Sequence, residues 1–257
     1  MSTKTDLAKE IIVKKSPVYS KMRKYFRGKT EITEIRIETD EESALIEKPK
    51  GTYITVEADY ARLPFGDFDE ELSALAAETE KLLSDKSKIL VIGIGNPLLT
   101  ADSLGPVAAE MIPCGKLFGK ELCAFSPGTE GKTGIEPDVL ISAAVEKLKP
   151  TAVILIDALA AEDISHICKT IQLTDSGLAP GSGAGKRKTA LCKETLGTPT
   201  AAMGTPTVIR YPDSDSVFVS PNDIALMVKK AARLMACAIT LAVFPELGAE
   251  TVKEMVI

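Results

Sequence analysis

The chain has 257 residues with a formal net charge of −5, and 45% of its residues are hydrophobic. This length suits one large α/β domain with a substantial core, and the composition is ordinary for a globular protein. The negative charge argues against nucleic acid as the main ligand, and residues 234–244, the apolar run nearest the C-terminus, are too few to span a membrane.

The N-terminal part of the chain predicts an arm, then two strands and a helix. Residues 1–30 are rich in lysine, with few large apolar side chains and no sustained hydrophobic period, so we expect a loosely packed arm. Their polar, charged start does not predict a signal peptide. Alternating apolar residues predict strands from residue 32 and over residues 52–58, with a helical turn at 41–46 between them. Leucines at helical spacing predict an amphipathic helix over residues 69–83.

A strand, a turn and a helix follow in residues 88–112, and this unit organises the rest of the chain. Residues 89–94 are an unbroken apolar run, typical of a strand buried on both faces of a parallel sheet. Asn96 begins a turn, and residues 104–112 have the period of a helix. Asp102 therefore lies where strand gives way to helix, at the carboxyl edge where open α/β sheets bind ligands.

Two further core elements indicate the fold class. A short strand over residues 121–125 runs into a glycine-bearing loop, and residues 137–147 predict a helix. Residues 152–156 form a second fully apolar strand, which we expect to end at Asp157. Strands joined in this way imply right-handed parallel crossovers. We therefore predict a three-layer α/β/α fold with a mostly parallel central sheet, as a single domain over residues 1–257.

The C-terminal third adds strands and one long helix. Strands are predicted over residues 169–173 and 201–209. The second contains Gly204 and Pro206, which suits an edge or a loop near a site. In the last helix we expect Ser220 as the N-cap and proline at the first helical position.

Asp102 and Asp157 are the main candidates for catalysis. If their strands are neighbours in the sheet, both carboxylates lie at the same edge. Two carboxylates that reach one water repel each other, so one stays protonated and can donate while the other accepts, as peptide hydrolysis needs. The structural alternative is that Asp102 caps the following helix and Asp157 binds the amides of a neighbouring loop.

The remaining motifs carry weaker signals. Gly93 and Gly95 resemble the start of a dinucleotide fingerprint, but its third glycine is missing. Residues 180–188 (PGSGAGKRK) are either an anion-binding or substrate-binding loop or an exposed hairpin tip. His166 is the only histidine, and a structural role is the more ordinary one for it. Five scattered cysteines without a CxxC pair favour reduced thiols over a disulfide framework, and no metal-ligand spacing is present.

Taken together, several segments resemble the germination (spore) protease family of endospore-forming bacteria. They are GIGNPLLTADSLGP, SPGTEGKTGIE, VEKLKPTAVILIDALAA, TIQLTDSGLAPGSGAGKRK and KETLGTPTAAMGTPTVI, with TDLAKE and KPKGTYITVEA before them. The likeness covers nearly the whole chain in the family's order. Two departures are PLLTAD in place of WNVTPD and a lost asparagine in GVGNKRK. Family members also carry a pro-segment before TDLA. Almost nothing precedes Thr5 here, so we expect zymogen control to be absent or achieved differently.

The resemblance implies an atypical aspartic-type endopeptidase that degrades small acid-soluble spore proteins at germination. The family's two essential aspartates match Asp102 in TADSLGP and Asp157 in LIDALA. It implies a fold shared with hydrogenase-maturation proteases, a homo-oligomer, and a place in the cytoplasm of the forespore or spore core, with no cofactor, metal, membrane or direct nucleic-acid partner. We expect the groove for an extended substrate to be lined by loop residues, namely Asn96, Gly128, Gly181, Gly183 and Lys186.

Two alternatives to this peptidase stay open from the sequence. One is a maturation-type protease that depends on a metal, with the two aspartates among its ligands. The other is a non-catalytic paralogue that binds spore proteins without cutting them.

Overall fold

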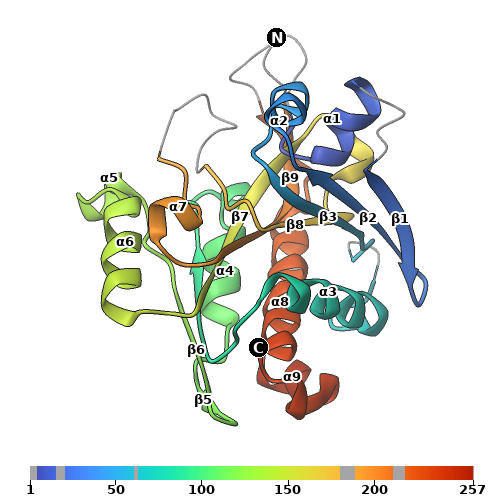
Figure 1. The fold of residues 1–257 in the computed structure, drawn as a ribbon. Coiled ribbons are helices and arrows are strands. Elements are labelled where there is room, and N and C mark those ends of the chain that lie inside the picture. The colour runs from blue at the N-terminus through green and yellow to red at the C-terminus, as the bar shows by residue number, and fades with distance from the viewer. Residues whose placement is uncertain (1–4, 16–20, 61–62, 180–188, 211–217, 257) are drawn as a thin grey trace.

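A ten-stranded sheet runs through the molecule (Figure 1). The computed structural model describes residues 5–15, 21–60, 63–179, 189–210 and 218–256. The strand order is β1-β2-β3-β8-β9-β7-β4-β6-β5, and β10 pairs with β9. The strands are β1 Met22–Arg27, β2 Thr30–Ile37, β3 Gly51–Glu57, β4 Lys88–Gly93, β5 Gly115–Leu117, β6 Lys120–Phe125, β7 Ala152–Ala161, β8 Thr170–Thr174, β9 Thr200–Arg210 and β10 Phe218–Val219.

The four central strands are parallel to one another, in the order β9-β7-β4-β6. Antiparallel strands extend this centre on both sides, with β1, β2, β3 and β8 beyond β9 and the short β5 beyond β6. Both β4 and β7 are buried on both faces, as their unbroken apolar runs predict. The α/β fold class is confirmed, and the antiparallel strands are an addition that the sequence pattern did not reveal.

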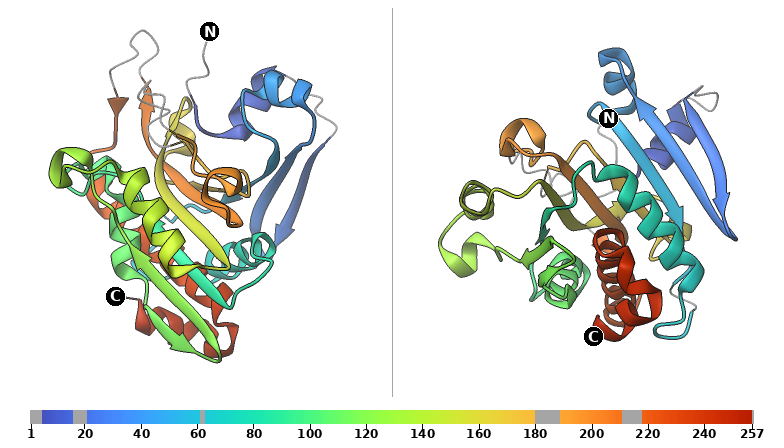
Figure 2. Two further views of the ribbon diagram at one scale, coloured as in Figure 1. Left: turned by 60° about the vertical axis from the view of Figure 1, so that its left-hand side comes forward. Right: turned by 60° about the horizontal axis from the view of Figure 1, so that its bottom comes forward.

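Helices cover both faces of the sheet and give the three layers (Figure 2). On one face α3 (Asp69–Leu82), α4 (Leu104–Met111), α8 (Ile224–Val243) and α9 (Gly248–Met255) share a core with β2, β3, β4 and β7. On the other face α6 (Pro137–Leu148) packs on β4 and β7, near α7 (Lys193–Leu196), while α1 (Ala8–Lys15) and α2 (Asp40–Ile46) pack on β2 and β3. The short elements are α5 (Glu130–Thr133), η1 (Thr100–Asp102), η2 (Ile164–His166) and η4 (Pro245–Leu247).

The N-terminal segment packs more closely than its lysine content suggested. Leu7, Ile11 and Ile12 are fully buried. Ile11 and Ile12 pack with residues of β2 and α2, and Leu7 packs in the main core. Asp6 makes two hydrogen bonds with Ala160 near the end of β7. Its backbone amide donates to Ala160 O (2.8 Å), and its carboxylate accepts from Ala160 N (2.9 Å). A loosely packed arm over residues 1–30 is therefore wrong for residues 5–15, where the lysines lie outside an apolar face too short to show a period.

Two strand predictions near the site are also corrected. The strand expected to end at Asp157 continues to Ala161, and the strand with Gly204 and Pro206 is an interior strand between β8 and β7. The register between β7 and β9 shifts after Leu159, which pairs with Pro206. The prolyl nitrogen has no hydrogen to donate, and a bulge is where an interior strand tolerates such a residue.

The long C-terminal helix α8 lies at the centre of one helix layer and is largely buried. It begins at Ile224 with Asp223 at the N-cap, so the predicted N-cap Ser220 was wrong. The chain first makes a turn in which Ile224 N donates to Pro221 O (3.2 Å), which delays the helix by three residues. Among the described residues, no helix has the length and apolar character needed to cross a membrane.

Candidate active site

Asp102 lies in the connection that leaves the carboxyl end of β4. The turn places it in η1, directly before α4, with a half-buried side chain. Its Oδ2 accepts a hydrogen bond from the backbone amide of Asn96 (2.8 Å), and Asn96 Oδ1 in turn accepts from Leu98 N (3.0 Å). Asn96 therefore shapes the loop that holds Asp102. Its predicted contact with substrate stays a prediction.

Asp157 lies in β7 at the level where its neighbour β4 ends. The last rung between the two strands joins Gly93 to Ile156, so Asp157 is one residue beyond it. On its other side Asp157 pairs with Gly204 of β9. Strand alternation places its side chain on the sheet face of Leu155, the face that α6 covers. Its Oδ1 accepts from the amide of Ala158 (2.9 Å).

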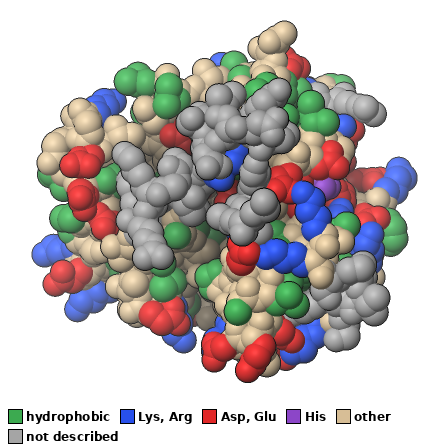
Figure 3. Space-filling view, turned by 90° about the horizontal axis from the view of Figure 1, so that it is seen from above, with side chains coloured by type: hydrophobic (Ala, Val, Ile, Leu, Met, Phe, Trp, Pro, Cys, Tyr) green, Lys and Arg blue, Asp and Glu red, His purple; other side chains and the backbone are tan. Residues whose placement is uncertain are grey.

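The strand that carries Asp157, β7, is the parallel neighbour of β4, the strand that leads to Asp102, as the sequence analysis required. The segment after β4 is drawn onto β7 by a hydrogen bond from Ile94 N to Ile156 O (2.8 Å). The start of α4 then packs against the same two backbones. A side chain at Gly105 would meet Ile94 O at 2.3 Å and Ile156 O at 2.4 Å, so only glycine fits there. Both acids therefore lie at the carboxyl edge of the central strands, which faces the viewer in Figure 3.

Thr207 is a buried residue near this edge that the sequence analysis missed. It is the extra residue of the bulge in β9, because Leu159 pairs with Pro206 and Ala160 with Val208. Its hydroxyl donates to the carbonyl of Ala101 (2.7 Å), the residue before Asp102. Thr207 therefore ties η1 to the sheet. No sequence signal identifies it, since the bulge depends on pairing between distant segments.

The predicted substrate loops are only partly described. Gly128 follows β6, the neighbour of β4, and has a left-handed φ of 72° in the turn before α5. At the start of this turn Ser126 has a buried hydroxyl with no hydrogen-bond partner among the described residues. Gly181, Gly183 and Lys186 lie outside the described residues.

His166 has a structural partner in Glu10 of α1. Its Nδ1 lies 2.6 Å from Glu10 Oε1, and Glu10 also accepts from the amides of Glu162 (3.0 Å) and Asp163 (3.1 Å). The hydrogen bond with Glu10 raises the pKa of His166 above its usual 6.5. Burial alone would raise the pKa of Glu10, but the bonds from His166 and the other donors outweigh it and lower that pKa. This pair fastens α1 to the chain beyond β7.

Cys168 does not offer the nucleophile of a Cys/His site. Its side chain is buried and its thiol donates to Pro206 O (3.6 Å). Burial is the main reason that its pKa is raised to about 12, so the thiolate is scarce at neutral pH.

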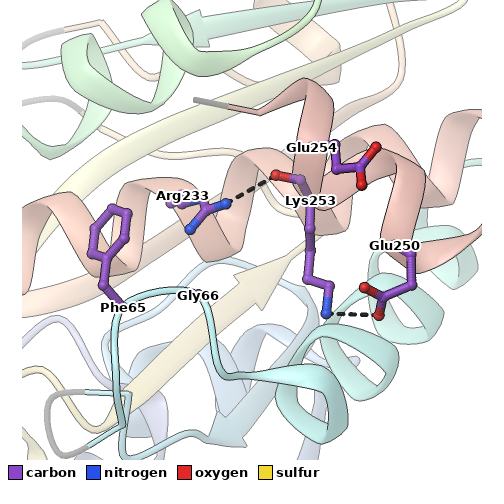
Figure 4. Close-up of a pocket in the computed structure, with 6 residues that line it drawn as sticks. All are labelled: Phe65, Gly66, Arg233, Glu250, Lys253 and Glu254. Carbon is purple, nitrogen blue, oxygen red and sulfur yellow. Dashed lines mark hydrogen bonds and ion pairs between the residues drawn. The ribbon is translucent and has the colours of Figure 1, made fainter.

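A cavity of about 450 Å³ lies elsewhere, between the loop before α3 and the helices α8 and α9 (Figure 4). Arg233 in its wall donates to Lys253 O (2.9 Å) and Val256 O (3.1 Å), and Lys253 pairs with Glu250 (2.7 Å). These cations are engaged within the chain, and no residue of β4, β7 or β9 lines the cavity. It is separate from the candidate active site. Within the described ranges, no three His, Cys, Asp or Glu side chains are grouped to hold a metal.

Comparisons with known proteins agree with the resemblance found in the sequence. The model of the germination protease family matches residues 18–236. The germination protease of Bacillus subtilis (strain 168) is 36% identical over 214 residues, which are 77% of this chain and 57% of that protein. The enzyme of Clostridium perfringens (strain SM101 / Type A) is 34% identical over 192 residues, 69% of this chain and 59% of that protein. This chain thus spans somewhat under three fifths of the length of these two relatives.

Two further matches complete the comparison. The germination protease of Clostridium tetani (strain Massachusetts / E88) is 33% identical over 253 residues, 90% of this chain and 77% of that protein. Among solved structures, the [NiFe] hydrogenase maturation protease HycI from Thermococcus kodakarensis KOD1 aligns with a TM-score of 0.43 and 21% identity, covering 63% of this chain and 98% of that one. The extent of the family match, together with identities above 30% over most of the chain, shows that this chain belongs to the germination protease family.

Proposed function

We propose that the protein is an endopeptidase that degrades small acid-soluble spore proteins during germination, with Asp102 and Asp157 as its catalytic pair. The observation that supports this most directly is the position of the two acids, Asp102 in the connection after β4 and Asp157 in the adjacent parallel strand β7 at the level where β4 ends, in a member of the germination protease family. This edge is where α/β folds carry out chemistry.

In the proposed mechanism the two carboxylates share one water. Two such groups over one water do not both stay ionised, so the pair holds a proton between them. The ionised member accepts a proton as the water attacks the peptide carbonyl, and the protonated member donates to the leaving amine. Each acid accepts a hydrogen bond from a backbone amide, Asp102 from Asn96 and Asp157 from Ala158, and these bonds orient the two carboxylates.

The surroundings suit an extended polypeptide substrate. The turn that contains Ser126 and Gly128 follows the strand next to β4, so a substrate that crosses the edge meets it beside the acids. Acidic and basic side chains are interspersed on this face rather than gathered into one patch (Figure 3). We further propose that the protein acts in the spore core and forms a homo-oligomer, which sedimentation of the purified protein tests.

The test is cleavage of a purified small acid-soluble spore protein by the wild type, Asp102→Asn and Asp157→Asn. We expect each variant to fold normally and to lose about 10²–10⁴-fold in rate, the usual contribution of a general acid or base. Asp40→Asn is the matched control, because Asp40 lies on the surface of α2 with an 88% exposed side chain. Full activity in either site variant would exclude the aspartate pair.

Two other outcomes would select the alternatives. Tight nickel, cadmium or zinc binding in equilibrium dialysis, lost in both aspartate variants, would indicate a maturation-type protease. Binding of the spore protein without any fragments from the wild type would indicate a non-catalytic paralogue.

A further inference from the structure

The hairpin β5–β6 has a geometry that fixes which residues face each other. Its strands pair as Gly115↔Leu122, Lys116↔Glu121 and Leu117↔Lys120. The two residues between them, Phe118 and Gly119, have φ angles of 51° and 75°. Two positive φ angles in a two-residue loop indicate a type I′ turn, and this turn sets the register of the strands.

The next position in this register brings two cysteines opposite each other. One step beyond Gly115↔Leu122, Cys114 faces Cys123. In a two-residue hairpin the pair next to the turn exchanges backbone hydrogen bonds, and bonded and non-bonded pairs then alternate. Cys114 and Cys123 therefore occupy a non-hydrogen-bonded position, where Cα atoms are about 4.5 Å apart and side chains on one face lie close together.

Pro113 explains why regular pairing ends one residue earlier. The next hydrogen-bonded pair of the hairpin, beyond Cys114 and Cys123, would need a backbone N–H at residue 113, and proline has none. Regular pairing thus stops at Gly115 although β6 itself continues to Phe125, paired with β4. A Cα separation of about 4.5 Å is within the range that a disulfide spans.

The two thiols differ in access in a way that suits stepwise oxidation. Cys114 is exposed, while Cys123 is half-buried beside the core under α6. Burial and then the neighbouring Glu121 carboxylate, which accepts from Cys123 Sγ at 3.6 Å, raise the pKa of Cys123, and the nearby Cys114 adds to this. A small oxidant therefore meets Cys114 first.

We propose that Cys114 and Cys123 form a cross-strand disulfide when the protein meets a small disulfide such as oxidised glutathione. The Cys114 thiolate attacks one sulfur of the oxidant and breaks its S–S bond, so that one glutathione leaves as a thiolate. The Cys123 thiolate then attacks Cys114 Sγ and releases the second glutathione. Two protein thiols are oxidised, one disulfide is reduced to two thiols, and the two protons of the cysteines go to these products.

Such a bond would fasten the chain after α4 to the strand that leads into the turn at Ser126. It would thereby connect the far end of the helix that follows Asp102 to the middle of β6. The remaining cysteines lack this arrangement: Cys168 and Cys237 are buried, and Cys192 bonds to Thr195 at the start of α7.

The experiment uses the whole native protein with excess oxidised glutathione, followed by alkylation of free thiols and a tryptic map without reduction. Trypsin cuts after Lys116 and Lys120, so it separates the two cysteines onto different peptides. We expect the peptide of residues 89–116 joined to that of residues 121–132, with two hydrogens lost, and free peptides again after dithiothreitol.

Two serine variants test whether Cys114 pairs specifically with Cys123. Cys123→Ser should stop at glutathione bound to Cys114, and Cys192→Ser should still give the joined peptides. The proposal is overturned if wild-type Cys114 ends with glutathione or an alkyl group while Cys123 is alkylated, or if Cys114 is joined to any other cysteine. Circular dichroism of the untreated variants checks that both serine substitutions leave the fold intact.

Discussion

Thr207 offers a direct test of how the fold positions Asp102. Its side chain is 1% exposed and its hydroxyl is the donor to Ala101 O at 2.7 Å. Thr207→Val keeps the shape of the side chain and removes this donor, which leaves the carbonyl without that bond. The loss of a bond to a buried polar group costs about 1–3 kcal/mol. We therefore expect the free energy of unfolding to fall by that amount and the rate of spore-protein cleavage to fall further, because η1 loses its tie to β9.

Urea unfolding gives the stability and initial rates of cleavage give the activity. Thr240→Val is the matched control. Thr240 is equally buried and its hydroxyl donates at 2.7 Å to Ala236 O, but that carbonyl lies inside α8 and keeps its helical partner. We expect the control to lose less stability and no activity. Wild-type stability and activity in Thr207→Val would refute the positioning role.

Other substitutions test the backbone packing at Gly105, the buried hydroxyl of Ser126 and the pair of Glu10 and His166. Gly105→Ala should lower the free energy of unfolding by about 3 kcal/mol or more, because the added Cβ would lie 2.3–2.5 Å from backbone atoms, while Gly115→Ala has open space and should cost little, as urea midpoints will show. Ser126→Ala should leave stability unchanged or slightly raised in the same assay, because it removes a buried hydroxyl that no described residue partners. Because the folded protein raises the pKa of His166, the charged histidine stabilises the fold fully below pH 6.5, and this stability is lost as the pH rises through the raised pKa. Because the folded protein lowers the pKa of Glu10, the stability from its carboxylate is present above pH 4.5 and is lost as the pH falls through the lowered pKa. The stability advantage of wild type over His166→Gln in urea unfolding should therefore be largest between the usual glutamate and histidine pKa values and fall as the pH rises above 6.5, and a constant difference would count against the pair.

Local patterns in the sequence predicted the central part of the fold well. The apolar runs of β4 and β7 and the helical periods of α3 and α6 are signals of buried strands and amphipathic helices, and the structure confirms these elements. The segment α1 was missed because eight residues with four buried positions give too short a period among lysines. Its packing depends on partners from β2, α2 and the end of β7, which a local reading does not include.

For the candidate site, too, the local pattern predicted the residues but not the contacts between distant segments. Asp102 was found because it follows one recognisable apolar strand, and Asp157 because it closes the apolar run of another. That the two strands are neighbours was a condition of the sequence analysis, and the pairing of β4 with β7 meets it. The contacts that hold them could not be read in advance. The hydroxyl of Thr207 reaches Ala101 only because a bulge shifts the register between β7 and β9, and this shift arises from the pairing of segments about 50 residues apart.

Close backbone packing also helps to set the positions of both acids. A Cβ at Gly95 would lie 2.0 Å from the carbonyl oxygen of Asp102, and one at Gly204 would lie 2.4 Å from that of Asp157. Each aspartate is thus carried by a peptide that another strand or loop approaches as closely as only glycine permits. It follows that replacing a carboxylate by an amide leaves these backbone contacts in place. Asp102→Asn and Asp157→Asn therefore test the chemistry of the pair, whereas Gly95→Ala and Gly204→Ala should displace the same two residues with their carboxylates intact.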